Sequence, residues 1–509
     1  MRILYIDCDS LRPDHLGCYG YERNTSPNID RLAEEGRHFR NCYTSDAPCL
    51  PSRTAHYLGQ FGVHTGVINH GGMNADLRPQ GADRHFGNEG IRKTFATALR
   101  QVGHRTAMVS SFPTRHAAWH VLDGFQEWVD PSVDFEGRAG TERADTVVPV
   151  AERWLRAHGR EDDWLLVINF WDPHIPYDTP LEYGNPVADD PAPDWPTEEV
   201  IREHRKGYGP RSARDIHGWG SPYAEGGGWG DNAGLSRTPS EIGSRGDFEE
   251  WIDGYDVGIH FMDEHIGQLF DLMRDLGIFE DTLVIVSADH GENQGELNVY
   301  GDHQTADDKT CRVPLVVRGP GVEPGVDEKL HYQLDLGPTL VDLAGGDPAP
   351  AWDGRSFADA LTGGKGTGRA HLVLGQGAWS CQRAVRWDDW LLVRTYHGGL
   401  KQLDPVMLFD LMDDPHEQHD IAADAPEVVA EGTRRLETWF ARTMDRAARG
   451  NGWTEADSPS ATDDPLWNVV REGGPYHAMR TGSVEPYLER LRETGRADHA
   501  ETLIRKHDL

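Results

Sequence analysis

Short apolar segments that alternate with segments of helical periodicity run through much of this chain. Residues 164–170, 282–287 and 313–317 are mostly apolar runs of strand length, and residues 248–276 repeat apolar side chains at helical spacing. Strands that alternate with helices favour a parallel sheet, which is buried on both faces. The pattern therefore predicts an α/β fold with a large, mostly parallel or mixed sheet that helices cover on both faces.

Charged residues stand where two of these strands end. The apolar N-terminal strand leads into Asp7 and Asp9, and the strand at residues 282–287 leads into Asp289 and His290. The carboxyl ends of the strands form the edge at which open α/β sheets bind ligands. The pattern therefore predicts that these side chains lie at a ligand-binding edge of the sheet.

A cysteine opens the run Cys-Leu-Pro-Ser-Arg, which extends from Cys49 to Arg53 and precedes a helix-like stretch at residues 54–61. This spacing places a nucleophile at the N-terminus of a helix, where backbone N–H groups favour anions. The alternative interpretation of the pentapeptide on its own is a buried cysteine in a turn.

The pentapeptide resembles the Cys-x-Pro-x-Arg signature of the type I sulfatases, the formylglycine-dependent arylsulfatase family of the alkaline phosphatase superfamily. That family opens on a strand that ends in Asp ahead of Leu-Gly-Cys-Tyr-Gly, which stands here at residues 16–20. The resemblance covers about residues 1–445, with further similar segments at residues 169–177, 289–292, 312–315, 334–345, 352–356 and 408–417. It implies a sulfuric ester hydrolase in which a large α/β domain and a small antiparallel domain pack as a unit.

In this family a maturation enzyme oxidises the signature cysteine to formylglycine. The resemblance implies that modification for Cys49, whose hydrated aldehyde would attack the sulfur of a small sulfated substrate, a carbohydrate sulfate or an aryl sulfate. It places Arg53 against the nucleophile and the anion, and His174 against the sulfate and the leaving oxygen. A histidine near its ordinary pKa can donate to a sulfate oxygen or protonate a departing alkoxide at neutral pH.

The resemblance also implies that Asp9, Asp289 and His290 bind one divalent cation. Hard carboxylate oxygens suit Ca²⁺, which we expect first, or Mn²⁺ or Mg²⁺, better than zinc. An Asp-capped turn would explain the glycine after His290 but not why both strands end in Asp. Ser10 stands where the family has a second Asp. Asp7 shares a face with Asp9 in an extended strand, so it either supplies the lost carboxylate or orients the site from outside the ligand set.

Two cationic positions of the family are missing from this chain. Asp302 stands where many sulfatases have a lysine that donates to the sulfate, so no role passes to Asp302, and His303 becomes the candidate donor. The family's Gly-Lys-x-His is also absent, which leaves Arg115, His116 or His120 as substitutes. Each lost cation removes a charge-assisted hydrogen bond of about 1.5–3 kcal/mol, so the leaving-group side of the pocket departs most from the family.

Two other functions remain open from the sequence. A phosphonate monoester or phosphodiester hydrolase of the same superfamily would share formylglycine and the metal, and the lost second Asp together with the Asp-His pair favours that subgroup. A non-catalytic anion-binding relative is the alternative of another class, because the Lys and His partners are missing. We expect the sulfatase first, since the signature and both strand ends match it.

Composition narrows the partners. The net charge of −34 argues against nucleic acid and against extended polyanionic polysaccharides, which the mean field would repel. The six cysteines are few for 509 residues and show no Cys-x-x-Cys pair, so a disulfide framework is not expected. No apolar run approaches the length of a membrane span, and the first strand follows Met1-Arg2 directly. From this we expect a cytoplasmic protein without a membrane partner.

The chain divides into three expected regions. Residues 1–375 form the catalytic domain, with an irregular insertion at about residues 178–245; residues 376–445 form a small α+β subdomain; and residues 446–509 are a C-terminal extension. The insertion is rich in Trp and Tyr, including the run at residues 225–230, which favours an ordered element near the pocket mouth over a distant packing loop. The extension could latch on its own core, form a homo-oligomer, or cover a neighbour's pocket.

Overall fold

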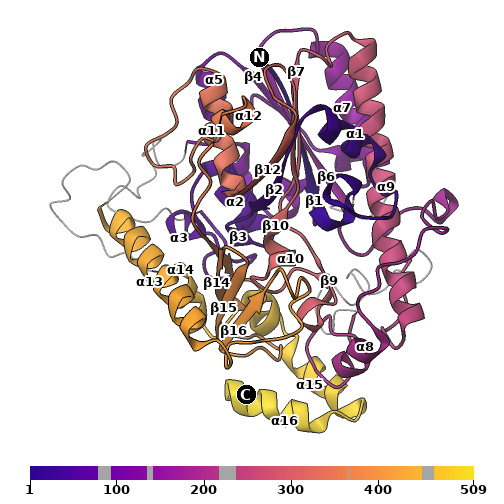
Figure 1. Ribbon diagram of the computed structural model, residues 1–509, viewed down its shortest axis with the longest axis vertical. Helices are drawn as coiled ribbons and strands as arrows, with labels where there is room; N and C mark the ends of the chain where they lie inside the picture. The colour runs from indigo at the N-terminus through magenta and orange to yellow at the C-terminus, as the bar shows by residue number, and fades with distance from the viewer. Residues whose placement is uncertain (78–92, 135–141, 217–236, 365, 450–463) are drawn as a thin grey trace.

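The computed structural model describes residues 1–77, 93–134, 142–216, 237–364, 366–449 and 464–509, and within these residues the chain forms two main sheets (Figure 1). The fold class expected from the sequence is confirmed, because a large mixed sheet and a smaller antiparallel sheet are both present. The run at residues 225–230 and the central part of the insertion, residues 217–236, lie outside the described residues.

The large sheet has nine strands: β1 (Arg2–Asp9), β2 (Arg37–Tyr43), β4 (Arg105–Val109), β5 (Glu127–Val129), β6 (Trp164–Pro173), β7 (Thr282–Ala288), β10 (Arg312–Val313), β11 (Leu315–Arg318) and β12 (Gly325–Tyr332). The order is β10-β2-β11-β7-β1-β6-β4-β5, with β12 paired to β2. Strand β1 lies in the middle and pairs in parallel with both β6 and β7. These strands are buried almost throughout, as their continuous apolar runs require.

Helices cover both faces of this sheet (Figure 1). One face carries α1 (Pro27–Glu35), α7 (Ala144–His158) and α9 (Arg245–Asp275), and the other carries α2 (Cys49–Leu58), α5 (Phe95–Gln101) and α11 (Leu336–Leu343). Shorter helices are α3 (Gly62–Thr65), α6 (Phe112–Arg115), α8 (Glu198–His204), α10 (Asp308–Cys311) and α12 (Ala358–Leu361). The expected helix at residues 248–276 is α9, which begins at Arg245 behind the cap of Ser244.

The small sheet follows the order β16-β15-β14-β13-β3. Its strands are β3 (Asp46–Ala47), β13 (Leu372–Gln376), β14 (Cys381–Trp387), β15 (Trp390–His397) and β16 (Val406–Asp410). Strands β13 to β16 are antiparallel, whereas β3 joins β13 in parallel and ends two residues before Cys49. The small sheet is thereby attached to the segment that carries the signature cysteine. A two-stranded sheet, β8 (Asn293–Gln294) with β9 (Tyr300–Asp302), lies beyond β7 in the chain.

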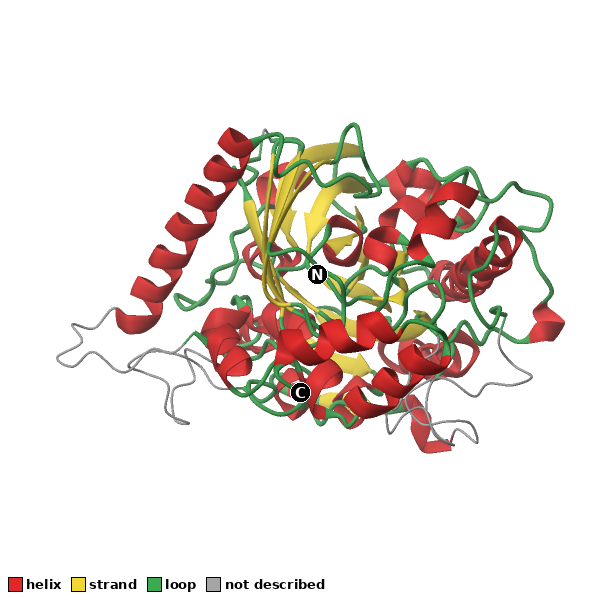
Figure 2. Cartoon of the chain, turned by 90° about the horizontal axis from the view of Figure 1, so that it is seen from below, coloured by secondary structure: helices red, strands yellow, loops and turns green. Residues whose placement is uncertain are grey.

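The C-terminal part of the chain is helical. Helix α13 (Pro426–Arg449) packs on the small sheet, and α14 (Pro465–Arg471), a π-helical turn (Tyr476–Arg480), α15 (Val484–Glu493) and α16 (Ala497–His507) follow. Figure 2 shows the helices around the C-terminus covering the lower end of the molecule. In these described residues the extension packs on its own chain, the first of the three arrangements left open by the sequence.

Buried ion pairs attach the extension to the insertion and to the small sheet. Asp215 of the insertion accepts two hydrogen bonds from Arg496, at 2.7 and 2.8 Å, and a third from Tyr487 at 3.1 Å. Asp464, at the start of α14, accepts hydrogen bonds from Nη1 and Nη2 of Arg383 on the small sheet, at 2.9 and 2.6 Å. The insertion also contacts the strand that precedes His303, because the N–H of Tyr300 donates to the carbonyl of residue 211 at 2.8 Å.

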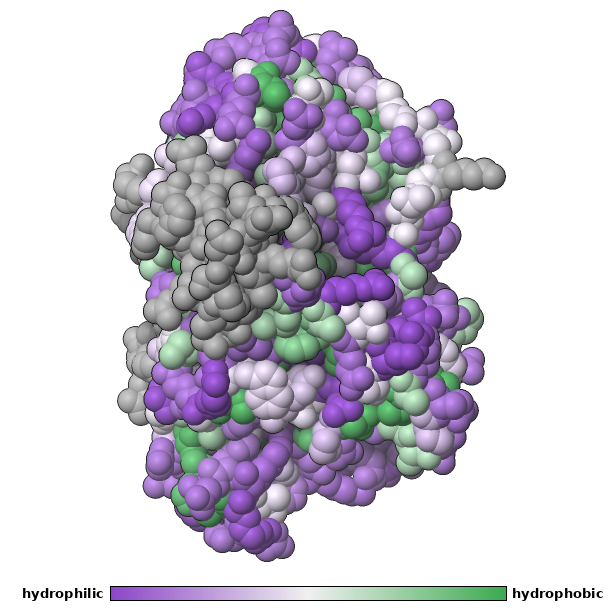
Figure 3. Space-filling model, turned by 90° about the vertical axis from the view of Figure 1, so that its left-hand side faces the viewer, coloured by the Kyte–Doolittle hydropathy of each residue, from purple (hydrophilic) through white to green (hydrophobic). Residues whose placement is uncertain are grey.

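All six cysteines are free, as expected. No helix in the described parts of the chain has the length and apolar character needed to cross a bilayer. On the face shown in Figure 3, hydrophilic side chains predominate and apolar ones form small, separate groups outside the grey atoms. The expected domain boundaries and the expected cytoplasmic location stay predictions.

Candidate active site

The carboxyl ends of β1 and β7 bring the predicted carboxylates together. Because the two strands run in parallel with Cys8 opposite Ala288, the residues that follow them meet at one edge of the sheet. The N–H of Asp289 donates to the carbonyl of Cys8 at 3.2 Å, and the N–H of Ser10 donates to Asp289 Oδ1 at 3.2 Å. Asp9 and Asp289 are both fully buried.

Cys49 is the first residue of α2, so the helix begins earlier than the stretch at residues 54–61 indicated. Pro51 falls in the first turn, where a missing N–H costs no helical hydrogen bond. The hydroxyl of Ser52 donates to the carbonyl of Asp289 at 2.5 Å, which fixes the start of the helix against the strand end. Cys49 is 3% exposed, and burial raises the pKa of its thiol well above the ordinary value.

Arg53 connects three carboxylates. Its Nε donates to Asp7 Oδ2 at 2.9 Å and its Nη1 to Asp9 Oδ2 at 3.2 Å, and Nη1 also lies 2.7 Å from Asp289 Oδ2. These side chains are at most 1% exposed. Among the described residues, Nη2 of Arg53 has no hydrogen-bond partner. A buried guanidinium nitrogen without a partner is suited to an anion bound beside Cys49.

The three carboxylates differ in their protonation. Burial raises the pKa of Asp7 to about 7 despite the guanidinium of Arg53 beside it. Burial also raises the pKa of Asp289. At Asp9, burial acts in the same direction, but Arg53, His174 and Arg115 outweigh it and lower the pKa well below the ordinary value. Asp9 is therefore the carboxylate that the site holds ionised most firmly.

Four side chains offer ligand atoms for a cation. One ligand atom from each lies within 4.8 Å of the others, and the residues are Asp9, Cys49, Asp289 and His290. His290 donates its Nδ1 proton to the carbonyl of Gly291 at 2.8 Å, so its Nε2 carries a lone pair. Nε2 lies 3.4 Å from Asp289 Oδ2 and 3.8 Å from Asp9 Oδ1. It has no hydrogen-bond partner among the described residues. A nitrogen lone pair that faces two carboxylates fits a bound cation.

Asp7 lies outside this group. Its Oδ2 accepts from Arg53 and, at 2.6 Å, from the side-chain amide of Asn169 on β6. Of the two roles left open for Asp7, the contacts favour the one in which it orients Arg53 from outside the ligand set.

Arg115 reaches the site from the end of α6. Its Nη2 lies 3.4 Å from Asp9 Oδ2, and its guanidinium stacks over the ring of Trp171 at 4.0 Å. The structure thus brings a second guanidinium, from one of the expected substitutes for the missing cations, to Asp9. His116 packs with its ring centroid 5.1 Å from that of His70, whereas His120 contacts the hydroxyl of Thr54 at 2.8 Å.

Two further histidines, His174 and His303, lie beside this group. His174 stacks on Trp171 at 4.1 Å and donates from Nδ1 to the carbonyl of Ile175 at 2.6 Å. His303 lies between His174 and His290, with ring centroids 5.4 and 4.2 Å away. Burial lowers the pKa of His174 to about 4, and burial likewise lowers the pKa of His303. Both rings are therefore neutral at pH 7 without substrate.

Comparison with known proteins identifies the family. The family model described as Sulfatase matches residues 2–346. The chain belongs to the sulfatase family. It is 25% identical over 504 residues to a choline-sulfatase of Rhizobium meliloti (strain 1021), covering 91% of this chain and 88% of that protein. It is 22% identical over 487 residues to an N-acetylglucosamine-6-O-sulfatase of Bacteroides thetaiotaomicron, covering 82% of each.

Solved structures share the fold. A phosphonate monoester hydrolase from Silicibacter pomeroyi superposes with a TM-score of 0.66 at 21% identity, covering 88% of this chain and 96% of that one. A protein in complex with its substrate D-glucosamine-2-N,6-O-disulfate gives a TM-score of 0.65 at 20% identity, covering 87% and 98%. The sulfatase-family assignment made from the sequence is confirmed, and this chain is an enzyme of that family.

The sequence analysis missed four residues of this sulfatase-family site. Asn169 holds Asp7, and Trp171 supports both Arg115 and His174. His70 lies with Nε2 3.6 Å from Cys49 Sγ, and His477 contacts His70. Asn169 and Trp171 stand in the segment at residues 169–177 that resembles the family, and this resemblance could have suggested them from the sequence. His70 and His477 belong to no motif, and His477 comes from the extension.

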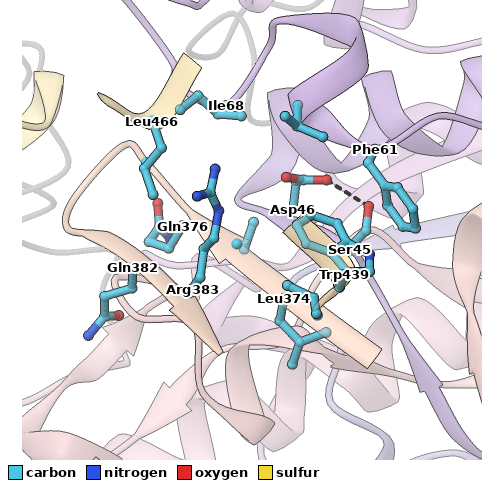
Figure 4. A pocket seen from close by; sticks show the side chains of 15 residues that line it. Ser45, Asp46, Phe61, Ile68, Leu374, Gln376, Gln382, Arg383, Trp439 and Leu466 are labelled. Atoms are coloured by element: carbon cyan, nitrogen blue, oxygen red, sulfur yellow. Dashed lines mark hydrogen bonds between the residues drawn. The ribbon is translucent and has the colours of Figure 1, made fainter. Parts of the chain in front are cut away.

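A cavity of about 20 Å³ lies beside this site rather than in it. It opens between the small sheet, α3 and α14, and Figure 4 shows Arg383 reaching from the sheet toward Ile68 and Leu466. None of the predicted site residues lines it. A cavity of this size can hold about one water molecule, which would lie where the extension contacts the small sheet.

Proposed function

We propose that this sulfatase-family enzyme is a sulfuric ester hydrolase that uses formylglycine at position 49 and one divalent cation. The observation that carries the proposal is the convergence of Cys49, two buried carboxylates and His290 around the guanidinium of Arg53. A hydrated aldehyde at position 49 would supply a nucleophilic hydroxyl at the start of α2, and a maturation enzyme would have to act on the Cys-x-Pro-x-Arg sequence to form it.

Asp9, Asp289 and His290 would hold the cation. Two carboxylates make Ca²⁺ the first candidate and Mn²⁺ or Mg²⁺ the alternatives, because hard oxygen ligands suit these cations. When bound, the cation would neutralise charge on the sulfate oxygens and lower the pKa of the attacking hydroxyl.

The chain's own residues supply the other contacts. Nη2 of Arg53 would donate to a sulfate oxygen, and Arg115, held by Trp171, would bind a second one. His174 and His303 are the candidates for protonating the leaving alcohol. Both rings are neutral in the free site, so the negative charge of a bound sulfate ester would have to raise the pKa of one of them before it could act as the acid. His116 would contact the substrate beyond Arg115.

A small sulfated molecule is the proposed substrate. The relatives named above include a choline-sulfatase and an N-acetylglucosamine-6-O-sulfatase, and one solved neighbour holds a disulfated glucosamine. These names support a screen of small alkyl, sugar and aryl sulfates rather than of polymers.

Phosphonate monoester or phosphodiester hydrolysis is the second candidate. Ser10, whose N–H binds Asp289, stands in place of a second carboxylate, and a phosphonate monoester hydrolase shares the fold.

Parallel turnover measurements separate these functions. Protein produced together with a formylglycine-generating enzyme is assayed on choline sulfate, N-acetylglucosamine-6-sulfate, an aryl sulfate, an aryl phosphonate monoester and an aryl phosphodiester, with Cys49→Ala as the control. We expect the highest kcat/KM on a sulfate ester and none from the control. A higher kcat/KM on the phosphonate or phosphodiester would favour the second candidate, and no turnover by fully modified protein would favour a binding relative.

A further inference from the structure

A ring nitrogen of His70 contacts the side chain of Cys49. Its Nε2 lies 3.6 Å from Cys49 Sγ and accepts from the N–H of Leu50 at 3.2 Å. An amide N–H can only donate, so Nε2 of His70 has to be the unprotonated nitrogen. The lone pair on Nε2 therefore faces both the thiol and this N–H. His70 therefore holds an acceptor against side chain 49.

The other nitrogen of His70 faces the extension. Its Nδ1 carries the ring proton and lies 3.0 Å from Nε2 of His477. His477 accepts that proton in a hydrogen bond, which fixes the tautomer and the orientation of the His70 ring.

Two further contacts hold His477 in place. Its N–H donates to the carbonyl of Ala378 at 3.0 Å, and its ring stacks on Trp379 at 4.8 Å between centroids with an angle of 26°. Both partners lie in the turn between β13 and β14. The bidentate pairs of Asp464 and Arg496 fasten the extension on either side.

We propose that His70 is the base of the sulfate-release step and that His477 is the positioning residue which keeps Nε2 of His70 available. The inference rests on the proposed function. After sulfate has moved to one hydroxyl of side chain 49, the O–H bond of the second hydroxyl breaks and its proton goes to Nε2 of His70. The freed electron pair forms the C=O bond, and the C–O bond to sulfate breaks with its electron pair on the departing sulfate.

The surroundings favour His70 for this task. Residues 110–113 read Ser-Ser-Phe-Pro where the family carries Lys and His, so the histidine of that motif is absent. His290 and His303 offer nitrogens within 4.8 Å of Cys49 Sγ, but the lone pair of His290 faces the two carboxylates. The extension thereby contributes to the site a residue that no part of the family signature supplies.

Mass spectrometry of the intact enzyme tests the role of His70. Formylglycine-bearing wild type, His70→Ala and His70→Asn are mixed with the best sulfate ester, and adducts on the peptide of residue 49 are measured with alcohol release. We expect both variants to release about one equivalent of alcohol and to accumulate an adduct about 80 Da heavier than the hydrate. Steady turnover should fall by about 10² to 10⁴-fold.

A second pair of variants tests His477. His477→Phe keeps the stack on Trp379 but cannot accept the Nδ1 proton, whereas His477→Gln can accept it through Oε1. We expect kcat to fall about tenfold or more in His477→Phe, with a partial adduct, and to recover in part in His477→Gln. His507→Ala is the matched control, because it removes an extension histidine that stacks on His397 at 4.6 Å. It should behave as wild type.

The outcomes separate the two proposals. Continuous alcohol release by His70→Ala at the wild-type rate, without adduct, would overturn the inference while the sulfatase function stands. Equal losses in His477→Phe and His507→Ala would overturn the positioning role, since only docking of the extension would then matter. If fully modified wild type turns over no sulfate ester, the proposed function and the inference fail together.

Discussion

Arg53 contacts three buried carboxylates, which is more negative charge than one guanidinium can neutralise. It contacts Asp7, Asp9 and Asp289, while Arg115 contacts Asp9 only. A buried carboxylate is costly unless it is paired, and here burial already raises the pKa of Asp7 to about 7. A divalent cation beside Asp9 and Asp289 would complete the balance, which is why the carboxylates and the metal have to be considered as one unit.

Arg115 gives the sharpest residue-scale prediction. Arg115→Ala removes one guanidinium from the anion site but leaves Arg53 in place, so kcat/KM for a sulfate ester should fall by about 10 to 150-fold, equivalent to about 1.5–3 kcal/mol. Steady-state kinetics measure the loss. Arg274→Ala is the control, because Arg274 stacks on Phe279 at 4.4 Å away from the site. Unchanged kinetics in Arg115→Ala would show that the substrate does not meet Arg115.

The sequence could place the residues of the signature and of the strand ends, but not those that tertiary packing adds. Asp9, Cys49, Arg53, Asp289 and His290 come together because parallel strands end at one edge and α2 starts beside it. His70 lies in a loop after α3, and His477 lies more than 400 positions further along. Nothing local marks such a pair, since only the docking of the extension creates it.

At the scale of elements, His64 joins α3 to α13. Its Nδ1 lies 2.6 Å from Asp353 Oδ2, and its Nε2 lies 3.0 Å from the carbonyl of Thr443 on α13. Both partners are acceptors, so both ring nitrogens donate and the ring is charged. Burial opposes this charge, but Asp353 and the Thr443 carbonyl outweigh it and raise the pKa of His64.

The docking of α13 should therefore depend on pH. A raised histidine pKa stabilises the fold fully below the unfolded value of about 6.5 and loses that effect as the pH rises through the folded value. His64→Leu should lower the free energy of unfolding by about 1.5–3 kcal/mol near pH 6 and by less near pH 9.

Thermal unfolding of wild type and His64→Leu at both pH values measures the difference. Asp353→Asn, which removes the charge partner, should also reduce the pH dependence. A difference between wild type and His64→Leu that is equal or larger near pH 9 would contradict the charged pair.

The periodicity of the sequence predicted the central strands of the large sheet but not the joints between elements. Strands β6, β7 and β11 lie where apolar runs of strand length indicated them. The two-residue strand β3 carries no pattern, because its pairing with β13 over 300 positions away defines it. The irregularity between Cys8 and Asp9 opposite β6 is equally invisible in the sequence, and it lies directly at the strand end that carries Asp9.

At the scale of the whole molecule, two guanidinium groups form an anion site inside an acidic protein. The net charge is −34, whereas Arg53 and Arg115 form the anion site. The mean field repels anions from the surface while the pocket attracts a single sulfate at short range. This repulsion should hinder the approach of a substrate with one sulfate less than that of a polysulfated chain.

Ionic strength should reveal this balance. Salt shortens the Debye length from about 30 Å at 0.01 M to about 8 Å at 0.15 M and so screens the repulsion. Over this range kcat/KM should rise more for a polysulfated oligosaccharide than for its monosulfated unit, with inert salt and constant pH. A larger rise for the monosulfated unit, or a fall for the polysulfated one, would contradict a repulsive mean field.

The central claim is that residue 49 becomes formylglycine in this fold. Mass spectrometry of the tryptic peptide that carries Cys49, from protein made together with a formylglycine-generating enzyme, tests it most directly. We predict a peptide lighter by about 18 Da than the cysteine form, the mass change from thiol to aldehyde. Unmodified cysteine in every molecule would contradict the claim and would favour an anion-binding relative over a hydrolase.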